Sequence, residues 1–175
     1  MMFRNVAALL LVTLVANVMP CRAEEKASSP ALKQFEALKK LAGDWVEVGA
    51  DGKPTTTVVS SFRITAGGNA ICETLKPGTD QEMITMYYLD GSDLLMTHYC
   101  TLGNQPRMRA EAGKDPQTIA FKFVGSTNLK TPDDHHMHDV TMKIAGPDRI
   151  QSEWTSFMDG KPCHEVKFTL ARLQK

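Results

Sequence analysis

Beyond residue 43 the chain consists of short runs rich in Val, Ile, Thr, Phe and Tyr, separated by turn sequences such as Asp51-Gly52 and Asp90-Gly91. Turn residues that recur about every eight to twelve positions are typical of β-hairpins. They divide this region into ten predicted strands, at residues 43–49, 56–65, 69–76, 82–89, 93–102, 106–112, 118–125, 135–145, 149–158 and 162–172. No helical segment separates the strands, which favours an antiparallel up-and-down meander. A meander of this size is expected to close into an all-β barrel, because closure hides the edge strands.

A short helix is predicted ahead of the first strand. Its apolar positions recur at intervals of three residues, at Leu32, Phe35, Leu38 and Leu41. Ser29 followed by Pro30 is a typical helix start, because serine caps free backbone N–H groups and proline fits the first turn. Gly43 follows the apolar stripe and marks the end of the helical segment. The pattern therefore predicts one amphipathic helix next to the barrel strands.

The first residues have the pattern of a secretory signal peptide. Arg4 supplies a positive charge, and an apolar run over residues 6–19 follows it. That run is too short to span a bilayer. Cleavage is expected after Ala23, where a small residue precedes a run of charged residues. A lipoprotein anchor at Cys21 is the less favoured alternative, because the residues just before it are not small. The pattern predicts an exported protein, periplasmic or secreted.

The chain is predicted to comprise a signal peptide at 1–23, a leader with the short helix at 24–42 and a barrel domain at 43–175. No second apolar stretch is long enough to span a membrane, so none is expected in the mature chain. Loss of Arg4 and Arg22 with the signal would leave 18 basic and 20 acidic residues, a formal charge of −2. This charge balance gives no indication of a clustered basic face, so nucleic acid is not the expected partner.

Three cysteines follow the signal segment, namely Cys72, Cys100 and Cys163. An odd number permits at most one internal disulfide, so the fold is not expected to depend on a disulfide framework. Cys100 near His98 is the obvious candidate for a nucleophile and its base, but no orienting acid or oxyanion donor accompanies the pair. A buried cysteine that acts as a small hydrophobic residue is the favoured interpretation. Enzymatic activity is therefore not the first hypothesis.

Alternation along the last three predicted strands indicates which side chains face the interior. The inward sets are His136, His138, Val140 and Met142; Ile150, Ser152, Trp154 and Ser156; and His164, Val166, Phe168, Leu170 and Arg172. An interior that contains histidine and serine is unusual for a filled core and common for a cavity. The pattern predicts a partly polar barrel interior.

In a meander, the connections after the odd-numbered strands lie at the same end, so they are expected to form one mouth. The predicted ligand-binding residues near this mouth are His98, Tyr99, Asn104, Gln105, Arg107, His136, His138 and Trp154. Of these, His98, His136 and His138 are candidate metal ligands, because neutral imidazole is the commonest metal ligand. Histidines near strand ends are also often only hydrogen-bonded, and no His-Glu-x-x-His or Cys-x-x-Cys motif is present. The sequence leaves both interpretations open and assigns no particular cofactor.

Gly43-Asp44-Trp45 at the start of the first predicted strand, together with Arg172 on the last, resembles a feature of the calycins, which include the lipocalin and fatty-acid-binding barrels. The resemblance implies a closed barrel in which the indole of Trp45 packs against the guanidinium of Arg172 as a cation–π pair. Gly43 is then the residue at which the chain enters the barrel.

Three segments, at residues 97–100, 103–108 and 136–138, resemble an exported bacterial branch of the calycins, which implies a fold but no activity. The strand count also resembles the haem-binding nitrobindins, although no histidine here can be matched to their haem ligand. The first function hypothesis is a module that binds a small, largely apolar molecule. The alternatives are a haem- or metal-binding protein or enzyme that uses the mouth histidines, and a structural or interaction domain whose barrel is filled. A cavity separates the first two hypotheses from the third.

Overall fold

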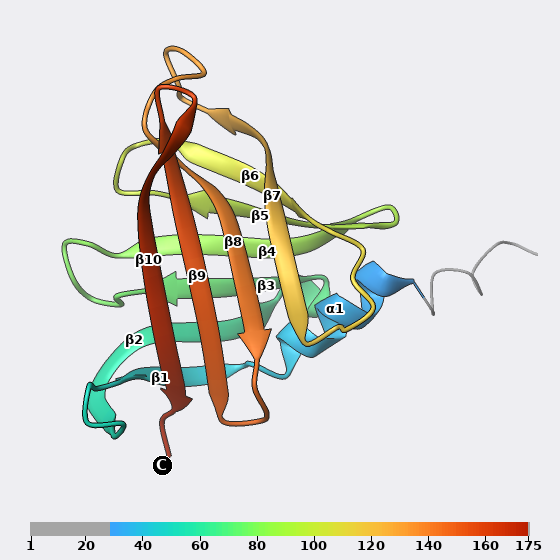
Figure 1. Ribbon diagram of the computed structural model, residues 1–175. Helices are drawn as coiled ribbons and strands as arrows, with labels where there is room; N and C mark the ends of the chain where they lie inside the picture. Colours follow the sequence, from blue (N-terminus) through green and yellow to red (C-terminus); the bar gives the residue numbers. More distant parts are fainter. Residues whose placement is uncertain (1–28, 175) are drawn as a thin grey trace, which may run out of the picture.

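The chain closes on itself, because the last strand pairs with the first (Figure 1). The computed structural model describes residues 29–174, so the predicted signal peptide lies outside the described residues. The elements are α1 (Pro30–Lys39), β1 (Gly43–Val48), β2 (Pro54–Thr65), the 3₁₀ turn η2 (Ala66–Gly68), β3 (Ala70–Leu75), β4 (Met83–Asp90), β5 (Asp93–Tyr99), β6 (Gln105–Ala110), β7 (Thr118–Thr127), β8 (His136–Ile144), β9 (Arg149–Met158) and β10 (Lys161–Arg172). Neighbouring strands are antiparallel and follow one another in chain order around the barrel. The predicted ten-stranded up-and-down barrel with one short helix is confirmed.

The barrel closes where Trp45 on β1 stands opposite Arg172 on β10. The guanidinium carbon of Arg172 lies 4.5 Å from the centroid of the Trp45 ring. Arg172 also donates hydrogen bonds to the carbonyls of Ala42 (2.8 Å) and Lys40 (2.9 Å), which follow α1 directly. Gly43 has a φ of +131°, a backbone conformation that favours glycine, and a Cβ there would lie 2.9 Å from a guanidinium nitrogen of Arg172. The Trp45–Arg172 contact that the resemblance implies is present.

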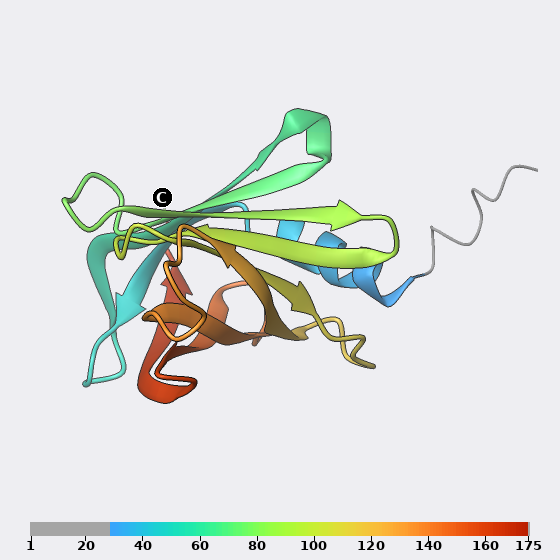
Figure 2. The same ribbon diagram turned by 90° about the horizontal axis from the view of Figure 1, so that it is seen from above.

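The helix α1 lies at one end of the barrel (Figures 1 and 2). Its first turn is capped by Ser29, whose hydroxyl accepts a hydrogen bond from the N–H of Leu32. The helix residues Phe35 and Leu38 are buried between α1 and the barrel. The side-chain amide of Gln34 donates a hydrogen bond to the carbonyl of Glu111 (3.0 Å). The apolar stripe read from the sequence is thus the surface by which α1 covers the barrel end.

The barrel half next to α1 is filled by apolar side chains. They form one buried cluster with the helix, to which Phe62, Ile71, Tyr87, Met96, Met108 and Phe121 belong. These residues come from β2 to β7, and each occupies the inward position of its strand. This half of the interior is an ordinary packed core, which leaves the opposite half as the place where a cavity can exist.

Strand register is interrupted at several points, and two of them lie in the half away from α1. A register shift separates Met137 from Asp139 where β8 pairs with β9, and another separates Pro162 from His164 where β10 pairs with β9. Each shift is a β-bulge, which inserts an extra residue and redirects the side chains on either side of it.

Among the described residues, no helix is sufficiently long and apolar to cross a membrane.

Candidate functional site

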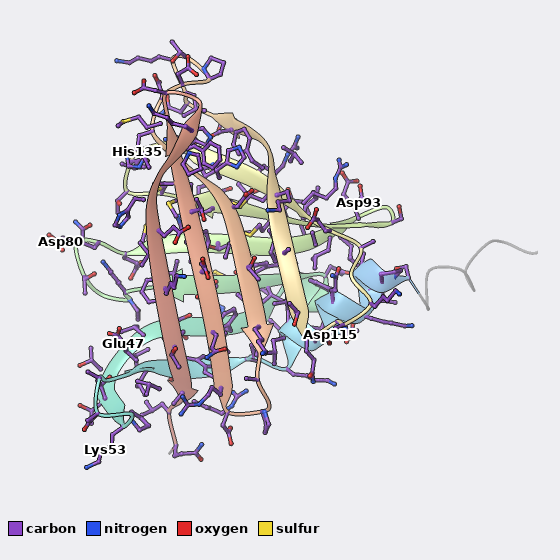
Figure 3. All side chains as sticks on the ribbon, viewed as in Figure 1. Glu47, Lys53, Asp80, Asp93, Asp115 and His135 are labelled. Carbon is purple, nitrogen blue, oxygen red and sulfur yellow. The ribbon has the colours of Figure 1, made fainter. Side chains whose placement is uncertain are left out.

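A cavity of about 490 Å³ occupies the barrel half away from α1. Its rim includes Lys76 and Gln81 from the connection after β3, and Leu102 from the connection after β5. Figure 3 shows Glu47, Asp80 and His135 along this side of the molecule, with Asp93 and Asp115 on the side of α1. Connections after odd-numbered strands therefore gather at the mouth, as expected for a meander.

The surface of the cavity wall is mostly apolar, although about half of the residues that line it are polar or charged. Apolar wall residues include Val59, Leu75, Met83, Met137, Trp154 and Phe168. The polar wall residues include Ser60, Glu73, His98, His135, Ser152 and Ser156. A cavity of this composition offers an apolar body to a ligand and a few fixed groups that orient it.

Glu73 is the buried carboxylate of the cavity, with only 3 % of its surface exposed. Its two oxygens accept hydrogen bonds from the hydroxyl of Ser60 (2.8 Å) and the hydroxyl of Tyr87 (2.6 Å). Burial raises the pKa of the Glu73 carboxyl, against the lowering effect of the two hydrogen bonds. The pKa of Tyr87 is raised well above its usual value by burial and by the adjacent carboxylate. Tyr87 therefore stays protonated and remains a hydrogen-bond donor to Glu73.

His98 stands near Glu73 in the same row of the sheet. Glu73 is opposite Thr85 on β4, and Thr85 is opposite His98 on β5, so the three side chains face the same way. The Nδ1 of His98 lies 2.9 Å from the Thr85 hydroxyl, and its ring is 5.0 Å from the Trp154 ring. Burial lowers the pKa of His98 to about 4. The imidazole is therefore neutral at physiological pH.

A second polar group lies near the mouth, around Ser156 on β9. The Ser156 hydroxyl is 3.1 Å from Nε2 of His135 and 3.2 Å from Sγ of Cys163. Asn104 holds this region in place, because its side-chain amide donates a hydrogen bond to the carbonyl of His135 (2.8 Å). Asn104 is buried and acts as a support for the loop before β8 rather than as a cavity wall.

Three of the predicted binding residues lie on the outside of the barrel. Tyr99, Gln105 and Arg107 line a separate surface groove, and Tyr99 is 50 % exposed. Alternation explains the placement, because His98, Pro106 and Met108 are buried and the residues next to them in each strand face outward. These three residues therefore do not meet His98 and Trp154, the two predicted binding residues that do line the cavity.

The expectation that His136 and His138 project into the barrel beside His98 is corrected by the structure, because neither residue lines the cavity. The bulge between Met137 and Asp139 changes the alternation of β8, so that Met137 lines the cavity instead. The ring of His136 lies 4.6 Å from that of Phe123, and the ring of His138 stacks on Phe157 at 3.8 Å. Both imidazoles belong to an aromatic cluster beside the mouth.

The predicted metal ligands are consequently not brought together. The ring centroids of His136 and His138 lie 5.5 Å apart in this aromatic cluster, whereas the His98 side chain lines the cavity. Within residues 29–174, no group of three or more His, Cys, Asp or Glu side chains is arranged to hold a metal ion. Cys100 lines the cavity with His98, whose Nδ1 is within hydrogen-bond distance of the Thr85 hydroxyl. The described residues thus do not assemble a three-ligand metal site from these candidates.

Sequence reasoning missed Glu73, the buried carboxyl group of the cavity wall. The signal was present in the predicted strand 69–76, because Ile71, Glu73 and Leu75 alternate on one face. A carboxylate between two apolar inward residues is rare in a filled core. His135 was likewise not predicted as a site residue, because its direction depends on the bulge in β8.

Scans of the sequence against models of protein families and against curated proteins find no match. The class of protein is therefore defined by the fold alone: a closed ten-stranded antiparallel barrel, consistent with a calycin-like fold and compatible with ligand binding.

Proposed function

We propose that this protein binds a small, largely apolar molecule in the cavity between the packed half of the barrel and its mouth. The observation that carries the proposal is the cavity itself, which has a volume of about 490 Å³ and a mostly apolar wall surface. Small-molecule sites in proteins are concave, mostly apolar and roughly 300–1,000 Å³ in volume. Trp154, with its ring against His98, supplies the largest flat surface of the wall.

The choice of residues at inward positions supports a binding role over a filled barrel. Ser60, Ser152 and Ser156 point to the cavity from strands whose other inward positions carry large apolar residues such as Ile150. A core that only had to stabilise the fold would be close-packed, because voids forfeit dispersion contacts. Short polar side chains at these positions keep the space open and provide hydroxyl groups to a bound molecule.

The experiment that tests this function is native mass spectrometry of the protein purified from its own host. We expect a mass adduct of a small organic molecule that is lost on denaturation. The matched control is the variant Ser152→Phe, which places an aromatic ring in the cavity and should return the mass of the chain alone. An adduct retained equally by the variant would place the bound molecule outside the cavity and contradict the proposal.

We also propose that the protein is exported, on the basis of the charged start, apolar run and cleavage site at residues 1–23. The N-terminal sequence of the protein recovered from its host should begin at Glu24. If the protein recovered from the periplasm or the medium still began at Met1, the predicted cleavage would be contradicted.

A further inference from the structure

Glu73 is a carboxylate without a cationic partner in the part of the chain that the structure describes. The ion pairs of residues 29–174 involve other acidic residues, all of them at least partly exposed. Removing a carboxylate from water is costly unless it is paired and hydrogen-bonded. Glu73 receives two hydrogen bonds and no positive charge, although it lines a cavity. Burial raises the pKa of this carboxyl, and a positively charged group inside the cavity would stabilise its ionised form.

The two hydroxyl donors fix the carboxylate and leave part of it free. An ionised carboxylate accepts about four hydrogen bonds through its two oxygens. Ser60 and Tyr87 use one position on each oxygen. Because Glu73 forms part of the cavity wall, the remaining positions are available to a donor inside the cavity. Tyr87 is itself packed against Phe121, with ring centroids 5.8 Å apart, so the packed core holds the Tyr87 hydroxyl in place.

The surroundings of Glu73 suit an ammonium group joined to an apolar body. His98 is neutral at physiological pH and does not repel a cation. Trp154 offers an aromatic face, to which cations and alkyl groups both bind favourably. Lys76 is the basic wall residue, and it belongs to the rim, where Glu47 also lies. An anionic ligand would meet the Glu73 carboxylate at the inner wall, whereas an amine would form a charge-assisted hydrogen bond there.

We propose that the cavity binds an amphipathic amine, with its protonated amino group on Glu73 and its apolar part against Trp154 and the methionines of the wall. This inference rests on the proposed function, because it names the class of ligand for the same cavity. Ser60 and Tyr87 act as positioning residues that hold the carboxylate toward the ligand.

The test uses octylamine, octanol and octanoate, which share one alkyl chain and differ in the head group. Octylamine is charged at neutral pH, since alkylamines titrate near the lysine value of about 10.4. Each compound displaces the neutral fluorophore N-phenylnaphthylamine from the purified protein. We expect octylamine to bind at least about tenfold more tightly than octanol, as a charge-assisted hydrogen bond in a buried site requires. Octanoate should bind more weakly than octanol.

The variant Glu73→Gln keeps the size of the side chain and removes its charge. We expect it to lose the preference for octylamine and to bind octanol within about twofold of the unmodified protein. The matched control is Glu153→Gln, which removes an exposed carboxylate of β9 that does not line the cavity and should retain the preference. Tyr87→Phe, which removes one donor to Glu73, should weaken octylamine binding without affecting octanol.

Each outcome has a defined meaning. Equal binding of octylamine and octanol, tighter binding of octanoate, or a preference that survives Glu73→Gln would overturn the amine inference and leave the binding function in place. Failure of the unmodified protein to bind the fluorophore and all three compounds would overturn the binding function as well.

Discussion

The guanidinium of Arg172 lies 4.5 Å from the ring of Trp45, and the two residues are direct partners across the β1–β10 pair that closes the barrel. Trp45 is fully buried, and its indole N–H donates a hydrogen bond to the carbonyl of Leu41 (2.8 Å). Arg172 bonds the two carbonyls that follow α1 and also the carbonyl of Pro147 (3.0 Å). The pair therefore joins the helix, the first strand and the last strand at one point.

Replacement of Trp45 by alanine is expected to destabilise the protein by about 3–5 kcal/mol, because it empties a buried aromatic site. The free energy of unfolding from urea denaturation measures the effect. A loss well under about 1 kcal/mol would show that the indole is not part of the core.

Replacement of Arg172 by lysine keeps the positive charge over the indole but cannot reach three carbonyls in different directions. We expect a loss of about 1–3 kcal/mol, since unsatisfied carbonyls near the helix end remain. Arg149→Lys, at an exposed position of β9, serves as the control and should change stability by less than about 0.5 kcal/mol. If the two substitutions lowered the free energy of unfolding equally, the Arg172 contacts would contribute no more to stability than an exposed arginine does.

His98 should make stability depend on pH in a defined window. Its pKa is about 4 in the folded protein and 6.5 otherwise, so the unfolded chain binds more protons between these values. The stabilisation from neutral His98 is fully present above pH 6.5 and is lost as the pH falls toward 4, by a total of about 3 kcal/mol. The variant His98→Gln should lack this component when urea unfolding is compared at pH 7 and pH 4. A variant with the same pH dependence as the unmodified protein would contradict a buried, neutral His98.

Glu73 should act in the opposite direction. Its pKa is raised in the folded protein from 4.5, so its contribution is present below that pH and is lost as the pH rises through the folded value. The stability of Glu73→Gln relative to the unmodified protein should therefore increase as the pH rises from about 4.5 toward neutrality. Urea unfolding of both proteins at several pH values measures the difference. A difference that stays constant, or one that decreases, would contradict a raised pKa.

Most of the fold could be predicted from the sequence because hairpins are determined locally. Turn sequences such as Asp90-Gly91 occur where the structure has its reversals, and the residues between them alternate as strands require. The contact between Trp45 and Arg172 could be predicted because it needs only two conditions. The barrel must close by pairing its first and last strands, and the two side chains must lie on the same face of that pair. These features depend on short stretches of chain or on the topology.

The candidate site was harder to predict because it depends on strand register. The bulge at His138 exists only in the pairing of β8 with β9, and no residue nearby in the sequence signals it. Tyr99 is a different case, because adjacent residues of a strand face opposite sides, so Tyr99 and His98 could not both line the cavity. Glu73 could be predicted from the sequence, because it is a charged residue between the apolar residues Ile71 and Leu75 on one strand face.

A fluorescence titration with N-phenylnaphthylamine tests whether the barrel binds a small molecule in its open half. Three proteins are compared: the unmodified chain, Ser152→Phe, which fills the cavity, and Gln151→Phe, which adds the same ring to the exposed side of β9. Circular dichroism confirms that all three are folded. We expect saturable binding by the unmodified protein and by Gln151→Phe, and an affinity at least about tenfold lower for Ser152→Phe, because a phenyl ring occupies the space that the fluorophore needs. Equal affinities in all three proteins, or no saturable binding by the unmodified protein, would contradict the binding of a small molecule in this cavity.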